Sequence, residues 1–197
     1  MTAPPRETIT AISTAIGAGA IAVVRVSGGR ALDIAEAVFS GDSLSTCASH
    51  TVHYGHVVDE SGEPVDEVLA AVLLAPHTYT TENMVEFSCH GGPMAARRVL
   101  EVLLASGARL ARRGEFTERA FLGGRIDLVQ AEAVADIVAA RTRRGLGVAL
   151  GQLDGALSGE LAKLRIELID FRAEVESLID FVEEDEGPRT AMAAAAA

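Results

Sequence analysis

The chain has 197 residues, of which 49% are hydrophobic and only 4% aromatic, and its formal net charge at pH 7 is −11. This length and apolar content allow one or two domains with their own cores. The acidic balance and the shortage of aromatic side chains argue against an autonomous nucleic-acid-binding protein. Two cysteines, Cys47 and Cys89, are too few for a zinc site or a disulfide framework. With no signal peptide and no membrane-spanning apolar run, the sequence predicts a cytoplasmic location.

Charge is distributed unevenly along the chain. Residues 1–96 carry 3 basic and 11 acidic side chains, residues 97–144 carry 10 and 6, and residues 145–197 carry 4 and 11. The basic middle could offer a local anion site for a carboxylate or a phosphate. The alternative is that these arginines only solvate helix faces.

The first part of the chain has a mixed α/β pattern. Segments rich in β-branched and apolar residues predict strands at 8–13, 21–26, 51–58, 68–74 and 85–90. Turn-forming residues at 59–64 predict a hairpin between the third and fourth strands. Helices are predicted at 29–39 and 93–105, followed by a short strand near 109–111.

The second part is helical. Gly123 and Gly124 break any helix that begins near Thr117, because glycine is unfavourable inside helices. From about residue 127 an apolar stripe with helical spacing predicts helices, with a break around 143–147 and one long helix to about residue 182. The sequence therefore predicts an α+β chain: one domain over residues 1–124 and part of an all-α domain over 125–197.

Several sequence motifs resemble those of one protein family. GEFTERAF at 114–121 and DLVQAEAVADIVAAR at 127–141 are similar to the tRNA modification GTPases of the MnmE/TrmE type, and so are RVSG at 25–28 and VEFSCHGGP at 85–93. The resemblance extends from about residue 7 to about residue 186. It implies that residues 1–124 form a folate-binding domain similar to the glycine-cleavage aminomethyltransferase. Residues 125–197 would begin a helical domain.

The resemblance also implies a function for the whole protein. The N-terminal domain would form a homodimer, which completes a pocket for 5-formyl-tetrahydrofolate. With an FAD-containing partner of the MnmG/GidA type, the protein would install a carboxymethylaminomethyl-type group on the wobble uridine of tRNA. The family hydrolyses GTP with K+ and Mg2+. No G-x-x-x-x-G-K-[ST] loop occurs here, so the GTP site is expected outside this sequence.

Three residues match the family's folate site: Arg25, Glu86 and Arg125. Arg25 and Glu86 each interrupt an otherwise apolar strand. A charge in such a run must face solvent or have a partner; simple outward alternation is the alternative to a ligand site. A glutamate suits the ring N–H donors of a pterin. Arg125 stands where many relatives have lysine, and a surface arginine at a helix start is its alternative reading.

Other features predict less. Adjacent strand residues point to opposite faces, so Cys89 and His90 cannot form a nucleophile–base pair, and Cys89 is predicted to be a buried thiol. The turn at 16–20 lacks the proline and arginine that many relatives have. The acidic helix end near residues 180–186 is predicted to be solvated, and the alanine-rich tail has no assigned role. No residue is assigned as a catalyst. Two other functions stay open: a self-standing folate-dependent transferase, or a dimerisation module with a vestigial pocket.

Overall fold

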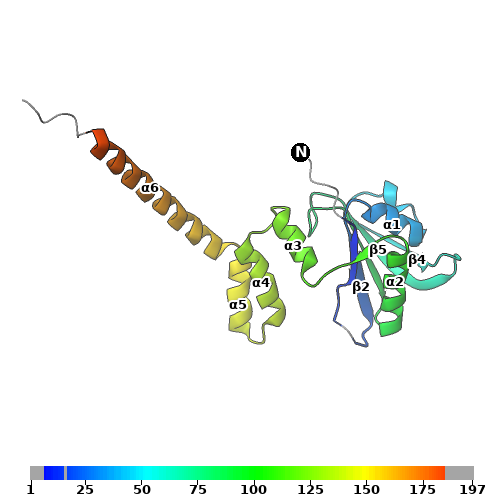
Figure 1. Cartoon of the computed structure of the whole chain (residues 1–197). Coiled ribbons are helices and arrows are strands. Elements are labelled where there is room, and N and C mark those ends of the chain that lie inside the picture. Colours follow the sequence, from blue (N-terminus) through cyan, green and yellow to red (C-terminus); the bar gives the residue numbers. More distant parts are fainter. Residues whose placement is uncertain (1–6, 16, 185–197) are drawn as a thin grey trace, which may run out of the picture. The chain divides into compact units, whose positions relative to one another are not determined.

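The computed structural model describes residues 7–15 and 17–184, with side chains to Ile179, and confirms the α+β class (Figure 1). Ile16, the acidic end from residue 180 and the alanine-rich tail therefore lie wholly or partly outside the described residues. The chain divides into two compact units between Ala131 and Glu132. No helix among the residues described is both long and apolar enough to cross a bilayer.

The first unit is built on a seven-stranded sheet with the order β3-β4-β5-β6-β2-β1-β7. All neighbouring strands are antiparallel except β1 and β7, which are parallel. The strands are β1 (Ile9–Ile12), β2 (Ile21–Ser27), β3 (Phe39–Gly41), β4 (Thr51–Val58), β5 (Pro64–Leu73), β6 (Met84–His90) and β7 (Arg109–Leu110). The predicted hairpin is present as β4 and β5. The short β3 and the 3-10 turn η1 (Leu44–Thr46) were not predicted.

Helices α1 (Ala31–Val38) and α2 (Pro93–Ala105) pack on one face of the sheet (Figure 1). Alternation along β2 sends Val24 and Val26 into this core, where both are fully buried, and Arg25 to the opposite face. Phe87 of β6 is the largest fully buried side chain. The core therefore occupies one side of the sheet, and the charged interruptions of the strands lie on the other.

The opposite face of the sheet is covered only in part. The segment between β5 and β6 and helix α3 (Glu115–Leu122) lie over the end that carries Arg25. Elsewhere on this face large apolar side chains are exposed: Ile21 by 65%, Val52 by 62%, Tyr54 by 61% and Leu69 by 47%.

The second unit contains most of α4 (Leu128–Ala139), α5 (Arg143–Leu153) and α6 (Ala156–Glu184). The predicted break at 143–147 is wrong, because residues 143–147 are the first residues of α5. Thr142 caps this helix by accepting a hydrogen bond from the Gly145 amide at 3.0 Å, so the break lies just before Arg143. The predicted continuous helix to residue 182 is also wrong. It is interrupted at Gly155, whose φ of 89° is left-handed and ends α5.

Candidate ligand-binding site

Arg25 and Glu86 form an ion pair across two central strands. They are direct neighbours in the β2–β6 register. Both Nε and Nη2 of Arg25 lie 2.7 Å from Oε1 of Glu86, and the side chains are 22% and 26% exposed. The second carboxylate oxygen, Oε2, has no hydrogen-bond partner among residues 7–15 and 17–179. The pair therefore offers a fixed, charged acceptor on a half-buried face.

Aromatic rings surround this ion pair. The guanidinium carbon of Arg25 lies 5.3 Å from the ring centroids of both Tyr79 and Phe116. That of Arg125 lies 4.9 Å from the Tyr79 ring, and its Nη1 donates a hydrogen bond to the Tyr79 carbonyl oxygen at 3.4 Å. These are cation–π distances. Tyr79 thus connects Arg25 with Arg125, although the two arginines are 100 positions apart in the sequence.

A pocket of about 420 Å³ opens beside these residues, which is within the range of small-molecule sites. Its lining residues are His50, Leu73, Pro76, His77, Thr78, Tyr79, Met84, Glu86 and Arg125. Arg25 does not line the pocket, but it contacts Glu86, which does. The structure therefore brings all three predicted residues together: Glu86 and Arg125 line the pocket, and Arg25 positions the Glu86 carboxylate.

A buried charge network holds the wall of this pocket. Arg119 of α3 is 4% exposed and its guanidinium bonds Glu82 at 3.0 Å, Glu115 at 3.1 Å and the Glu7 carbonyl oxygen at 2.8 Å. Glu82 accepts in turn from the Ser27 hydroxyl at 3.0 Å. α3 is thereby fixed to the β5–β6 segment that carries Tyr79. These residues had no predicted role, although a glutamate and an arginine four positions apart in a short helix are a typical ion-pair signal.

The Gly-Gly break after α3 has a steric cause. A Cβ on Gly123 would collide with Oγ1 of Thr81 and would lie 3.3 Å from the Thr80 carbonyl oxygen. Gly124 has a φ of 73°, which is left-handed backbone. The break predicted at these two glycines is confirmed, and it lets the chain turn closely past the β5–β6 segment before Arg125.

We expect Glu115 to make stability depend on acid pH. Hydrogen bonds from Arg109, the Arg112 amide and Arg119 lower the pKa of Glu115 from 4.5 to about 2 against the effect of burial. Such a shift corresponds to about 3 kcal/mol of stability, which is complete above pH 4.5 and is lost as the pH falls towards 2. Urea unfolding of wild type and Glu115→Gln should give a difference that shrinks over this interval. A difference independent of pH would contradict this assignment.

Cys89 and His90 do not belong to this pocket. Cys89 is buried as predicted, its thiol donates to the Ala22 carbonyl oxygen at 3.4 Å, and burial raises its pKa to about 11. His90 is exposed and its Nδ1 lies 2.7 Å from Oδ1 of Asp66, a hydrogen bond that raises the pKa of His90. The predicted absence of a dyad follows from this geometry, since the two side chains have separate partners on separate faces.

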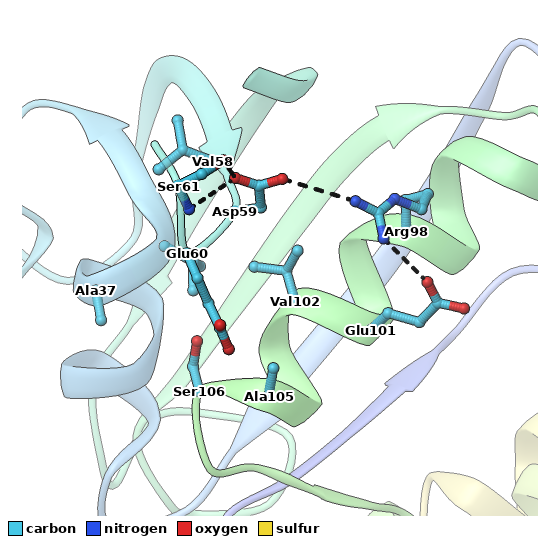
Figure 2. A pocket seen from close by; sticks show the side chains of 11 residues that line it. Ala37, Val58, Asp59, Glu60, Ser61, Arg98, Glu101, Val102, Ala105 and Ser106 are labelled. Atoms are coloured by element: carbon cyan, nitrogen blue, oxygen red, sulfur yellow. Dashed lines mark hydrogen bonds and ion pairs between the residues drawn. The ribbon is translucent and has the colours of Figure 1, made fainter. Parts of the chain in front are cut away.

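A different cavity of about 490 Å³ lies on the helix side of the sheet, between α1, the β4–β5 turn and α2. Figure 2 shows Asp59 and Glu101 pointing towards Arg98 at its rim, with distances of 3.8 and 3.3 Å. Asp59 also accepts hydrogen bonds from Ser61, which lower its pKa. These charges are already satisfied within the fold, so the cavity is a weaker candidate than the pocket at Glu86.

Most of this chain is similar to known proteins. A family model described as the GTP-binding protein TrmE N-terminus matches residues 8–125, and a model described as the MnmE helical domain matches residues 128–196. Proteins named tRNA modification GTPase MnmE are similar over 91% of the chain: 53% identical in Lacticaseibacillus paracasei, 49% in Bacillus mycoides and 50% in Bacillus cereus. The chain covers 39 to 40% of the length of these relatives. A family model that spans most of the chain, joined directly to a second model of the same protein type, shows that the chain belongs to the MnmE/TrmE family, as its N-terminal and helical segment.

Proposed function

We propose that this chain is the folate-binding and dimerising segment of a tRNA modification GTPase. Residues 1–124 would hold 5-formyl-tetrahydrofolate as a one-carbon carrier, and residues 125–197 would begin the helical domain. The observation that carries the proposal is the Arg25–Glu86 pair. It fixes one carboxylate oxygen, leaves the other without a partner among the described residues, and lies beside aromatic rings and a pocket of suitable size.

The chemistry of a pterin fits this arrangement. Its amino and ring N–H groups are donors that the open oxygen of Glu86 would accept, and its flat ring suits the Tyr79 and Arg125 surface. We propose that Arg25 holds Glu86 ionised and oriented and that Arg125 meets an acceptor of the ligand. None of the three would exchange protons with a reacting group, so their role is binding and not catalysis.

The rest of the family's activity would belong to other parts of the protein. We propose that GTP, K+ and Mg2+ bind outside this sequence, and that the modified substrate is tRNA. An FAD-containing protein of the MnmG/GidA type would be the partner. A cytoplasmic location suits the two free thiols. The exposed apolar side chains of α6, such as Leu164 and Leu168, would be covered by the remainder of the helical domain.

The open sheet face is our candidate for the homodimer interface. Tyr54 of β4 and Leu69 of β5 are cross-strand neighbours, and Val52, Ala71 and Glu86 follow one another across β4, β5 and β6. A contiguous apolar surface of this kind is unusual on a monomer and typical of an interaction site. A second copy placed on this face would also reach Glu86, at the end of the line formed by Val52, Ala71 and Glu86, and would complete the pocket.

We therefore expect the chain to be a dimer at micromolar concentration. Leu69→Asp should give a folded monomer, because the side chain is half exposed in one protomer and a charge there opposes association. Met94→Asp is the matched control, since Met94 is 66% exposed on the helix side of the sheet. Sedimentation equilibrium measures both variants. A monomeric wild type, or a dimer that persists in Leu69→Asp, would contradict this interface.

The ligand itself is tested by calorimetric titration of 5-formyl-tetrahydrofolate into the wild-type chain, with GTP as the comparison ligand. We expect saturable folate binding with one site per protomer and no binding of GTP. Absence of folate binding by a properly folded dimer would favour the dimerisation module with a vestigial pocket.

A further inference from the structure

Three arginines lie together where α4 is joined to α5. Arg141 precedes the cap residue Thr142, and Arg143 and Arg144 are the first two residues of the helix. All three side chains are exposed. The Thr142 hydroxyl accepts a hydrogen bond from the Gly145 amide and so caps the start of α5, and the three positively charged groups lie within four residues of the chain.

In the described part of the structure seven arginines have an acidic partner, whereas these three do not, and the same is true of Arg30, Arg113, Arg125 and Arg165. Within the described part of the structure, none of the three makes an ion pair or hydrogen bond. By contrast, Arg97 lies 2.9 Å from Glu101, and Arg172 lies 3.3 Å from Glu176. Three guanidinium groups within four residues have no partner in the described part of the structure, so an external anion is the group that would stabilise them.

The surrounding sequence strengthens the contrast. Residues 137–153 contain these three arginines and no aspartate or glutamate, in a chain whose net charge is −11. α5 also contains Gly147 and Gly151, although a Cβ at either position would meet no atom of this chain within 4 Å. Glycine there costs helix stability without an internal packing reason, and it leaves the helix backbone open to close approach by another molecule.

We infer that the α4–α5 turn is a contact surface for the phosphate backbone of tRNA. The inference rests on the proposed function, in which tRNA is the substrate, and it adds where the RNA touches this segment. Guanidinium groups bind phosphate oxygens in a bidentate manner, and such contacts position an RNA without reading its sequence. An otherwise acidic surface would repel the RNA elsewhere and so favour docking at this turn.

The test is the binding of unmodified tRNA, transcribed in vitro and fluorescently labelled, to the full chain at increasing KCl. We expect Arg143→Gln/Arg144→Gln to weaken binding at low salt by at least tenfold. Each phosphate contact contributes about 0.7 to 0.9 to the slope of log affinity against log salt. Removing two contacts should therefore reduce that slope by roughly 1.4 to 1.8. Thermal melting checks that the variant remains folded.

The matched control is Arg165→Gln/Arg172→Gln, which changes net charge equally but alters exposed positions on α6. We expect it to retain the wild-type salt slope. Equal losses in both double variants would reduce the effect to net charge and overturn the assignment, as would wild-type affinity in the α4–α5 variant or no tRNA binding by the wild type. The folate titration is independent of these arginines, so a negative tRNA result with normal folate binding refutes this inference alone.

Discussion

Glu86→Gln is expected to weaken the binding of 5-formyl-tetrahydrofolate about tenfold or more. The substitution keeps the size of the side chain and one acceptor oxygen but removes the negative charge. Hydrogen bonds to a charged group contribute roughly 1.5–3 kcal/mol, which corresponds to about one to two orders of magnitude in affinity. The measurement is the same calorimetric titration, with thermal melts to confirm that each variant is folded.

Three further variants make this titration specific. Arg25→Met should also weaken binding, because it leaves Glu86 without the guanidinium that orients it at 2.7 Å. Arg125→Lys should matter least, since it keeps the positive charge beside Tyr79. Glu63→Gln, in the exposed β4–β5 turn, changes the net charge as Glu86→Gln does and should leave affinity unchanged. Equal affinity of wild type and Glu86→Gln would place the folate site elsewhere.

Arg119→Met is expected to lower the free energy of unfolding by about 3–5 kcal/mol. Breaking a buried ion pair from one side is costly because the remaining charge is left without compensation. Here Glu115, which is 3% exposed, would lose one of its arginines, and Glu82 and the Glu7 carbonyl oxygen would lose theirs. The change is measured from the urea-induced unfolding transition of the first unit.

Arg97→Met provides the comparison for this variant. Arg97 contacts Glu101 at 2.9 Å on the surface of α2, outside the buried network, and exposed pairs contribute about 0–1 kcal/mol. If both substitutions destabilise the protein equally, the buried network is not what fixes α3. Loss of stability in Arg119→Met should also reduce folate affinity, since Tyr79 lies on the segment that this network holds.

The sheet was largely predictable from local patterns. Alternating burial along β2 and β6 follows from the sequence. Arg25 and Glu86 are charged residues in otherwise apolar strands, which marked them as candidates for a site. Their pairing depends on the β2–β6 register, which is set by long-range packing and is not readable from either strand alone. The same holds for Tyr79, whose contact with both arginines depends on how the β5–β6 segment folds back.

Helix ends were predicted less well, for local reasons. A helical stripe continues across Asp154 and Gly155, so periodicity gave no sign that α5 ends at Leu153. The deciding features were a threonine cap and one left-handed glycine, each a single residue. The roles of Glu115 and Arg119 were missed because charged residues in a short helix suggest an exposed surface. Here both side chains are buried and form an ion pair with each other.

If the proposed dimer forms on the open sheet face, the alignment of Val52, Ala71 and Glu86 across three strands would make ligand binding depend on protein concentration. Two strand spacings, about 10 Å, separate the backbone of the exposed Val52 from that of Glu86. If a second copy covers the surface between these two residues, folate binding and dimerisation stabilise each other by mass action. Dilution would then weaken the apparent folate affinity, and saturating folate would tighten the dimer by the same factor.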